Sequence, residues 1–498
     1  MAEQSNSRNT YGNIFKALML FGSVKFIQIF ISILRSKLIA ILLGPSGMGI
    51  NNLLVSTTNT INGFTGCGLQ TSAVREVSKA HSSNNQVKIN VTISTLKILV
   101  WFTGFLGALI VFLFAKSFSI LAFNNEEYTN AFRFLSVMML FMQINVGQIS
   151  LMQGTFHYKE IAKSTLAAQI LSLLITIPLY YIFGKDGIVP ALLVASLITV
   201  FVTAYFSRRV EYTRVKLSIK DFFTNSKCMI SLGIVIALGG VISNSSSYIL
   251  NIIISHIGSI EAVGLYSATM TIANSYVFIV LSAMTSDYVP RLSALSGNDV
   301  AQIEAINKQM VLVSIIMAPL LVALIVFARQ VIYILYSSDF FTTIHMLEFL
   351  MLAMYFRAIS WCLSYSFISR GESKIFLINE VVIFIISLSL KTCGFIWNGY
   401  TGIGMALVLI YILYSLMMYI VAKKKFGYKF SKEFIRISII SIIICSMAVI
   451  FSYCLGNVWY KYVIGSCILV ASLFFCVIEL NKRINLLGNV KRKLLKKS

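Results

Sequence analysis

Long apolar stretches separated by short polar turns recur along almost the whole chain. A stretch of about 20 apolar residues is what an α-helix needs to cross a bilayer. Because only helices and closed barrels satisfy their backbones in lipid, the pattern predicts an all-α polytopic membrane protein. We expect about fourteen transmembrane helices, over residues 14–41, 50–74, 91–118, 129–156, 164–183, 188–207, 228–257, 262–290, 309–336, 343–369, 375–397, 402–422, 434–456 and 462–481.

The second half of the chain repeats the first at an offset of 215 residues. Three separate stretches match at this offset: residues 106–112 with 321–327, 134–135 with 349–350, and 187–188 with 402–403. A duplicated set of six helices predicts two lobes in the same orientation, related by a pseudo-two-fold axis along the membrane normal. In transporters built this way the substrate path lies between the two copies.

The repeat predicts four parts of the chain. Residues 1–207 form a first six-helix lobe, and the basic stretch 208–227 is a cytoplasmic linker. Residues 228–422 form the second six-helix lobe. Residues 423–498 have no counterpart in the first half, and we expect an extra helix pair followed by a basic cytoplasmic tail.

Composition and charge support the membrane interpretation. The chain is 57% hydrophobic and 12% charged, well below the charge content of soluble domains. Most of the 41 lysines and arginines lie in the termini and in every second loop, which places both termini in the cytoplasm by the positive-inside rule. The net charge of +23 therefore indicates contact with anionic membrane lipids rather than nucleic acid. No motif for a metal, a cofactor or ATP is present, so we expect a carrier and not an enzyme.

The first predicted helix carries a polar face inside its apolar stretch. Lys25, Gln28, Ser32 and Arg35 recur at intervals of three or four residues, which places them on one side of a helix. A charge near the bilayer centre costs about 2.5–3.5 kcal/mol on insertion scales, so such a cation is a candidate for function. The alternative for Arg35 is that its long side chain reaches out to the membrane interface.

Amides recur on four other predicted helices: Asn52, Asn59, Gln148, Asn244 and Asn274. Together with Gln28 they are candidates for the wall of a hydrated cavity that binds sugars. The alternative is that they join helices by packing and hydrogen bonds.

The predicted spans of the second lobe also contain charged residues. Arg357 is a candidate cation for the substrate, whereas Asp287, Glu348 and Glu380 are candidates for coupling transport to an ion.

The beginning of the chain resembles the bacterial Wzx-type flippases of O-antigen and other oligosaccharide lipids, in the multidrug/oligosaccharidyl-lipid/polysaccharide (MOP, MATE-like) exporter superfamily. The resemblance rests on Lys25, Arg35 and Lys37, followed by the turn Leu43-Gly44-Pro45-x-Gly47-x-Gly49. The related lipid II flippases carry a further arginine where this chain has Thr271, and Arg357 is the candidate that replaces it.

The resemblance implies a flippase that moves undecaprenyl-diphosphate-linked oligosaccharide, such as a lipopolysaccharide repeat unit, to the periplasmic leaflet of the inner membrane by alternating access. Lys25, Arg35 and Arg357 would bind the diphosphate, and the glycan polymerase machinery is an implied partner. The alternative is an ion-coupled multidrug exporter of the same superfamily, which needs a buried acid to bind a cationic drug.

Overall fold

The computed structural model of the 498-residue chain describes residues 27–483 except 84, 214, 216, 219–221, 223–225, 228, 232, 235–240, 242–243, 275–279, 282–283, 286–287, 289–290, 294, 296, 371, 373 and 456–458. Helices make up the fold, and no strand occurs among these residues. The chain packs into two compact units, Met1–Gly264 and Leu265–Ser498. The prediction of an all-α chain is confirmed.

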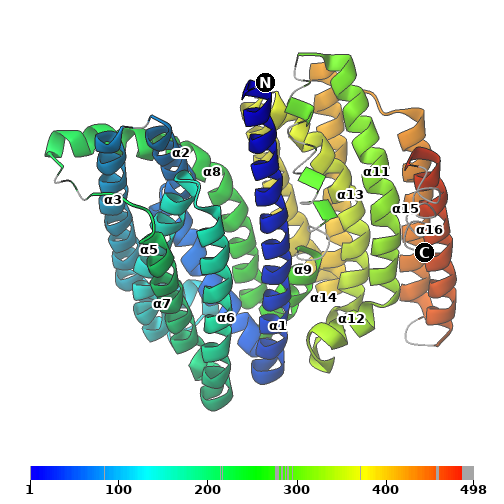
Figure 1. The fold of residues 1–498 in the computed structure, drawn as a ribbon. Helices are drawn as coiled ribbons and strands as arrows, with labels where there is room; N and C mark the ends of the chain where they lie inside the picture. The colour runs from blue at the N-terminus through cyan, green and yellow to red at the C-terminus, as the bar shows by residue number, and fades with distance from the viewer. Residues whose placement is uncertain are drawn as a thin grey trace, which may run out of the picture. The chain divides into compact units, whose positions relative to one another are not determined.

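The first unit runs from blue to green in Figure 1. Its core is built from α3, α5 and α7, in which α5 packs against both of the others. The elements are α1 (Ala2–Thr65), α2 (Leu69–Ser82), α3 (Gln86–Leu113), α4 (Ala115–Phe123), α5 (Thr129–Gly154), α6 (Tyr158–Phe183), η1 (Gly184–Gly187), α7 (Ile188–Ser207) and α8 (Ile219–Ile257).

Helix α8 belongs to the first unit because it packs against α1 and α2. A Cβ atom built on Gly233 would lie 2.1 Å from the carbonyl oxygen of Cys67, so the two backbones touch at this point. The predicted division of the chain at 208–227 follows the sequence repeat rather than this packing, and it stays a prediction.

The second unit holds the remaining elements, and α9 begins just before it. Helix α13 packs against α11 and most closely against α14. The elements are α9 (Ile260–Ile272), α11 (Asp299–Val326), α12 (Ala328–Leu335), η3 (Ser338–Thr343), α13 (Ile344–Ser369), α14 (Ser373–Phe426), α15 (Lys432–Leu455) and α16 (Trp459–Ile484).

Nine helical segments in the described part of the chain are long and apolar enough to cross a membrane. Three of these, with 39, 50 and 53 residues, are each long enough for two crossings: Ile27–Thr65, Tyr158–Ser207 and Lys374–Phe426. The chain is therefore a multi-pass membrane protein. Large apolar side chains on the outer surface support this conclusion. On α3, Trp101, Phe102 and Phe105 are between 59% and 64% exposed.

Glycines mark the reversals within the long helical segments. Helix α1 is interrupted at Gly44, whose φ of 66° is followed by Pro45, and this separates the first two predicted spans. Glycine adopts positive φ without the steric penalty of a Cβ atom. The second span was predicted to end at residue 74, but α1 already ends at Thr65. After a turn at Gly68 (φ 61°), α2 runs on to Ser82, into the segment between the second and third predicted spans.

Equivalent backbone features recur in the two halves and support the predicted repeat. Gly184 (φ 56°, ψ −129°) and Gly399 (φ 53°, ψ −134°) lie 215 residues apart and have nearly the same conformation. Asn85 and Asn298 both cap a helix, α3 and α11, by accepting a hydrogen bond from the backbone three residues later. Their separation of 213 residues shows that the offset shifts by two within the repeat.

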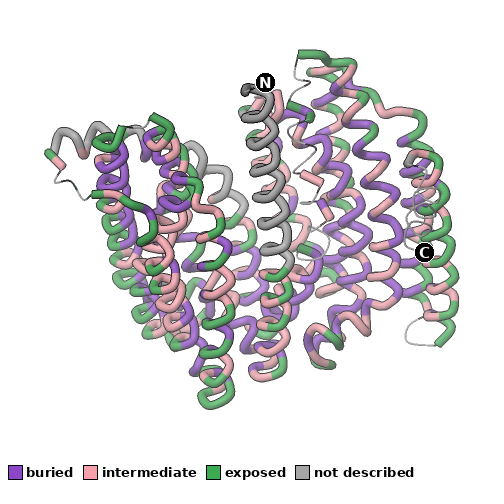
Figure 2. The backbone as a smooth tube through the Cα atoms, in the orientation of Figure 1, coloured by how far each residue is buried: buried purple, intermediate pink, exposed green. Residues whose placement is uncertain are grey.

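The C-terminal pair α15 and α16 packs on the second unit through contacts with α11. Figure 2 shows α11 and α13 mostly buried, whereas α16 is mostly exposed on its outer side. At one end of the pair, Asn307 of α11 accepts hydrogen bonds from the Tyr428 hydroxyl at 3.1 Å and the Ser431 amide at 3.0 Å. At the other end, Glu348 of α13 binds Lys461 of α16.

Candidate functional site

The first predicted cation site lies on α1 before its kink. Lys25 falls outside the described residues. Arg35 and Gln28 are partly buried, and Arg35 has no ion-pair partner among the described residues. An intramembrane guanidinium without a carboxylate partner remains available to an anionic ligand.

The polar residues after the kink of α1 divide into two groups. The hydroxyls of Thr57 and Thr65 donate to backbone carbonyls four residues earlier, so they are satisfied within their own helix. Asn52 and Asn59 are different, because Asn52 is only partly buried and Asn59 is exposed. Asn52 and Asn59 therefore remain candidates for lining a cavity that binds sugars, whereas the two threonine hydroxyls are used within the helix.

The other two predicted amides of the first unit differ in their surroundings. Gln148 of α5 accepts a hydrogen bond from the Thr203 hydroxyl of α7, so its carbonyl joins two helices. Asn244 of α8 is exposed.

The second unit brings two predicted site residues together. The Arg357 Nη1 of α13 donates to the Oδ1 of Asn274 at 2.7 Å, and the guanidinium lies 5.7 Å from the ring centre of Tyr411. The charge of Arg357 also acts on the ammonium of Lys391 in α14. Neither cation has a carboxylate partner among the described residues. This group of Arg357, Asn274, Tyr411 and Lys391, here the Arg357 cluster, therefore carries uncompensated positive charge.

The predicted ion-coupling acids are not equivalent. Glu348 is fully buried and is bound by Lys461 at 2.8 Å, by His345 at 2.9 Å and by the Ser452 hydroxyl. Its charge is compensated within the second unit. Glu380 accepts a hydrogen bond from the Tyr414 hydroxyl, and Asp287 lies outside the described residues.

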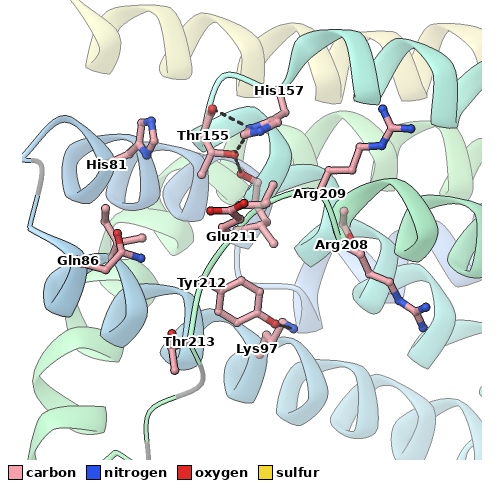
Figure 3. A pocket seen from close by; sticks show the side chains of 14 residues that line it. His81, Gln86, Lys97, Thr155, His157, Arg208, Arg209, Glu211, Tyr212 and Thr213 are labelled. Carbon is pink, nitrogen blue, oxygen red and sulfur yellow. Dashed lines mark hydrogen bonds between the residues drawn. The ribbon is translucent and has the colours of Figure 1, made fainter.

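A cavity of about 1010 Å³ in the first unit was not predicted from the sequence. Figure 3 shows its lining, which comes from the end of α2, the start of α3, the turn between α5 and α6, the end of α7 and the segment 208–213. We call this cavity the vestibule. A second cavity of about 340 Å³, the groove, lies between α3, α5 and α7.

Lys97 is the charged residue that both cavities share on α3. Its ammonium donates to the Tyr212 hydroxyl and lies 4.5 Å from the centre of that ring. A lysine eleven residues inside an apolar helix was the sequence signal that could have identified this site.

Comparison with known proteins shows a family match and several solved structures with the same fold. The family described as polysaccharide biosynthesis protein matches residues 38–345. No match was found among curated proteins. Among solved structures, the lipid II flippase MurJ in an inward closed conformation has a TM-score of 0.73 at 15% identity, covering 94% of this chain and 100% of MurJ.

Two further solved structures share the fold. A multidrug resistance MATE family transporter of the MOP superfamily, in its inward-facing conformation, has a TM-score of 0.67 at 16% identity and covers 82% of this chain and 98% of its own. A MOP superfamily transporter from Pyrococcus furiosus, described as having a binding pocket of reverse polarity, has a TM-score of 0.59 at 15% identity, with 83% and 96% covered.

The chain shares this helical fold with the lipid II flippase MurJ and with transporters of the MOP superfamily, in agreement with the resemblance found in the sequence. Because the family match spans more than half of the chain, the protein belongs to the polysaccharide biosynthesis protein family.

Proposed function

We propose that this protein moves polyprenyl-diphosphate-linked oligosaccharides from the cytoplasmic to the periplasmic leaflet of a bacterial inner membrane, by alternating access of two lobes. The family supports a role in polysaccharide biosynthesis, and MurJ, which has the same fold, is a flippase of lipid II. The basic loops and tail support an orientation with both termini in the cytoplasm.

The Arg357 cluster is the single observation that carries this proposal. Arg357 is held by a neutral amide and an aromatic ring, and the nearby charge of Lys391 has the same sign. Holding two cations without a carboxylate inside a membrane is unfavourable, and a diphosphate offsets that cost. Arginine suits this role because its planar guanidinium binds phosphate oxygens in pairs.

We assign roles in the same transport cycle to the other predicted site residues. Arg35, with Lys25, supplies the positive charge of the first lobe. Asn52, Asn59 and Asn244 contact the sugars through amides, which exchange hydrogen bonds with water at small net cost. The polyprenyl chain stays in the bilayer, and a glycan polymerase receives the product.

A translocation assay tests the proposal. The purified protein is reconstituted into liposomes with a fluorescent undecaprenyl-diphosphate disaccharide, and loss of fluorescence on adding a membrane-impermeant quencher reports the outer leaflet. We expect Arg357→Ala to reduce the rate of translocation at least tenfold. Arg133→Ala is the matched control, because Arg133 is exposed near the start of α5. A wild-type protein that fails to move the probe, or an Arg357→Ala variant as fast as wild type, contradicts the proposal.

One observation favours the alternative of an ion-coupled drug exporter. Glu380 is a partly buried carboxyl in α14 that accepts a hydrogen bond from Tyr414, and such an acid is what proton coupling requires. If the protein is a drug exporter, wild type takes up a cationic dye into inverted vesicles in a proton-driven manner, and Glu380→Gln abolishes this uptake. If it is a flippase, neither wild type nor Glu380→Gln takes up the dye.

A further inference from the structure

The vestibule and the groove adjoin each other inside the first unit. Five residues line both cavities, among them Lys97, Tyr212 and Arg208. The vestibule is bounded by helix ends, whereas the groove is lined mainly by apolar side chains such as Val100, Trp101 and Ile144. A polar cavity and a mainly apolar cavity therefore lie on either side of these shared residues.

Residues of α3 line both cavities. Gln86 at the start of the helix lines the vestibule, Lys97 lines both cavities, and Trp101 lines the groove. At 1.5 Å per residue, the apolar lining from Ile93 to Trp101 extends about 12 Å along the helix. Lys97 therefore lies within the length of α3 that lines the groove and also faces the polar vestibule, and Trp101 is exposed on the outer surface of the helix.

Two cations, Lys97 and Arg208, lie at the junction of the two cavities. Lys97 donates one hydrogen bond to Tyr212 and has two further N–H groups. Arg208 also lines both cavities, and neither residue has a carboxylate partner among the described residues. Arg209, by contrast, is bound to Glu160 at 3.4 Å. The junction therefore suits a phosphate group, which lysine binds as a point charge.

The vestibule itself suits sugars better than a small headgroup. Its volume of about 1010 Å³ is about three times that of the groove. It is lined by groups that donate and accept hydrogen bonds, among them Gln86, His157 and Thr213. The Glu211 carboxylate lies on the vestibule side only, where it repels phosphate but accepts hydrogen bonds from hydroxyls.

We infer that the first unit contains a loading site for the lipid-linked oligosaccharide, apart from the Arg357 cluster of the second unit. In this site the phosphate binds Lys97 and Arg208, the glycan occupies the vestibule, and the first part of the polyprenyl chain lies in the groove. The inference rests on the proposed function for its substrate. The polar vestibule, the cations that both cavities share and the apolar groove offer one surface to each of the three parts of such a lipid.

Binding to the full-length protein in nanodiscs tests the loading site. The probe is an undecaprenyl-diphosphate disaccharide with a dansyl group on the chain near the diphosphate, and energy transfer from Trp101 reports occupancy of the groove. We expect Lys97→Gln to weaken binding at least tenfold. Filling the groove with Ile144→Phe, which adds no tryptophan, has the same effect. Trp101→Phe removes the energy-transfer signal, whereas Trp397→Phe on the exposed surface of α14 does not.

Lys88→Gln is the matched control, because Lys88 is an exposed lysine of α3 that lines neither cavity. Undecaprenyl phosphate without sugar is expected to bind more weakly than the probe. Equal binding of these two lipids overturns the inference, as does equal binding by wild type and Lys97→Gln. Displacement by phosphatidylglycerol or by inorganic pyrophosphate also overturns it, because the occupant is then a bilayer lipid or free phosphate.

Failure of the loading site is distinguishable from failure of the proposed function. If wild type translocates the probe but gives no Trp101 signal, only the loading site is wrong. If wild type binds but never translocates the probe, the proposed function is wrong.

Discussion

Gly49 and Gly264 occupy equivalent positions in the repeat and pack reciprocally. A Cβ atom built on Gly49 would lie 1.9 Å from the carbonyl oxygen of Ile260, and one built on Gly264 would lie 1.8 Å from that of Pro45. Each glycine thus contacts the backbone four residues before the other. The second half of α1 and the start of α9 therefore cross at backbone distance, which only residues without a side chain allow.

We expect Gly264→Ala to destabilise the protein because the added methyl group forces these two helices apart. Overpacking of this kind typically costs about 1–3 kcal/mol. The melting temperature of the purified protein in detergent is the measurement. Gly297→Ala is the control, since nothing lies within 4 Å of a Cβ atom at that position. Equal melting temperatures for the two variants contradict a tight crossing.

A second prediction concerns the charge of the Arg357 cluster. Asn274→Asp places a carboxylate where Arg357 now binds an amide at 2.7 Å, so the cation gains an internal partner. We expect translocation of the fluorescent disaccharide lipid to fall at least tenfold, while the melting temperature stays the same or rises. The fall follows because the carboxylate competes with the diphosphate for the guanidinium.

The chain offers a matched control for this charge change. Arg133 donates to the Oδ1 of Asn130 at 3.3 Å, in an arginine–asparagine pair that is exposed. Asn130→Asp therefore introduces the same chemistry at a position away from the cluster, and translocation should remain normal. A normal rate in Asn274→Asp means that Arg357 does not bind the diphosphate.

Much of the fold follows from the sequence because membrane helices leave a simple signal. Length and hydropathy predict the spans, and the 215-residue offset predicts the equivalence of Gly184 and Gly399 before their matching backbone angles are known. The helix that continues to Ser82 was not predicted, because the turn at Gly68 depends on backbone angles rather than on apolar length.

The site was less predictable because it depends on contacts between distant residues. Arg357 and Asn274 were each candidates for their polarity, yet nothing in the spacing indicated that they touch. Two of the three partners of Glu348 lie 104 and 113 residues away in the extra helix pair, so its ion pair with Lys461 has no local signal. Lys97 was missed because Tyr212, its partner, follows the sixth predicted span in a polar segment.

A third prediction concerns the buried pair of Glu348 and Lys461. Both side chains are at most 2% exposed, and their charged atoms are 2.8 Å apart. Lys461→Met leaves the carboxylate buried without its main partner, and breaking such a pair typically costs about 3–5 kcal/mol. We expect a large fall in melting temperature, most of which the double variant Lys461→Met with Glu348→Gln recovers.

An exposed pair provides the control for this effect. Lys308 binds Glu304 at 2.7 Å, but both side chains are more than 60% exposed, so Lys308→Met should change the melting temperature little. If Lys461→Met is as stable as wild type but translocation loses its dependence on an ion gradient, Glu348 couples transport and is not a structural residue.

The last prediction concerns the loop between α14 and α15, which is hydrogen-bonded to Asn307 of α11. The Oδ1 of Asn307 accepts from the Tyr428 hydroxyl and the Ser431 amide, and its Nδ2 donates to the Lys429 carbonyl at 3.1 Å. Asn307→Ala removes three hydrogen bonds to the loop and leaves the Tyr428 hydroxyl with only the sulfur of Met310 at 3.3 Å. A buried polar group left without its partner costs about 1–3 kcal/mol. Tyr428→Phe removes only one of these bonds. We therefore expect a clearly larger fall in melting temperature for Asn307→Ala than for Tyr428→Phe, and equal falls contradict the assignment.

Tyr428 adds a dependence on pH that separates the two variants further. Burial raises the pKa of its phenol above the ordinary value of 10.0, so the folded protein keeps the proton when the unfolded chain loses it. A raised folded pKa gives stability that is complete below the unfolded pKa and is lost as the pH rises above it. The melting temperature of wild type should therefore fall more steeply between pH 9 and 11 than that of Tyr428→Phe. Parallel curves for the two proteins would show that the phenol titrates as it does in solvent.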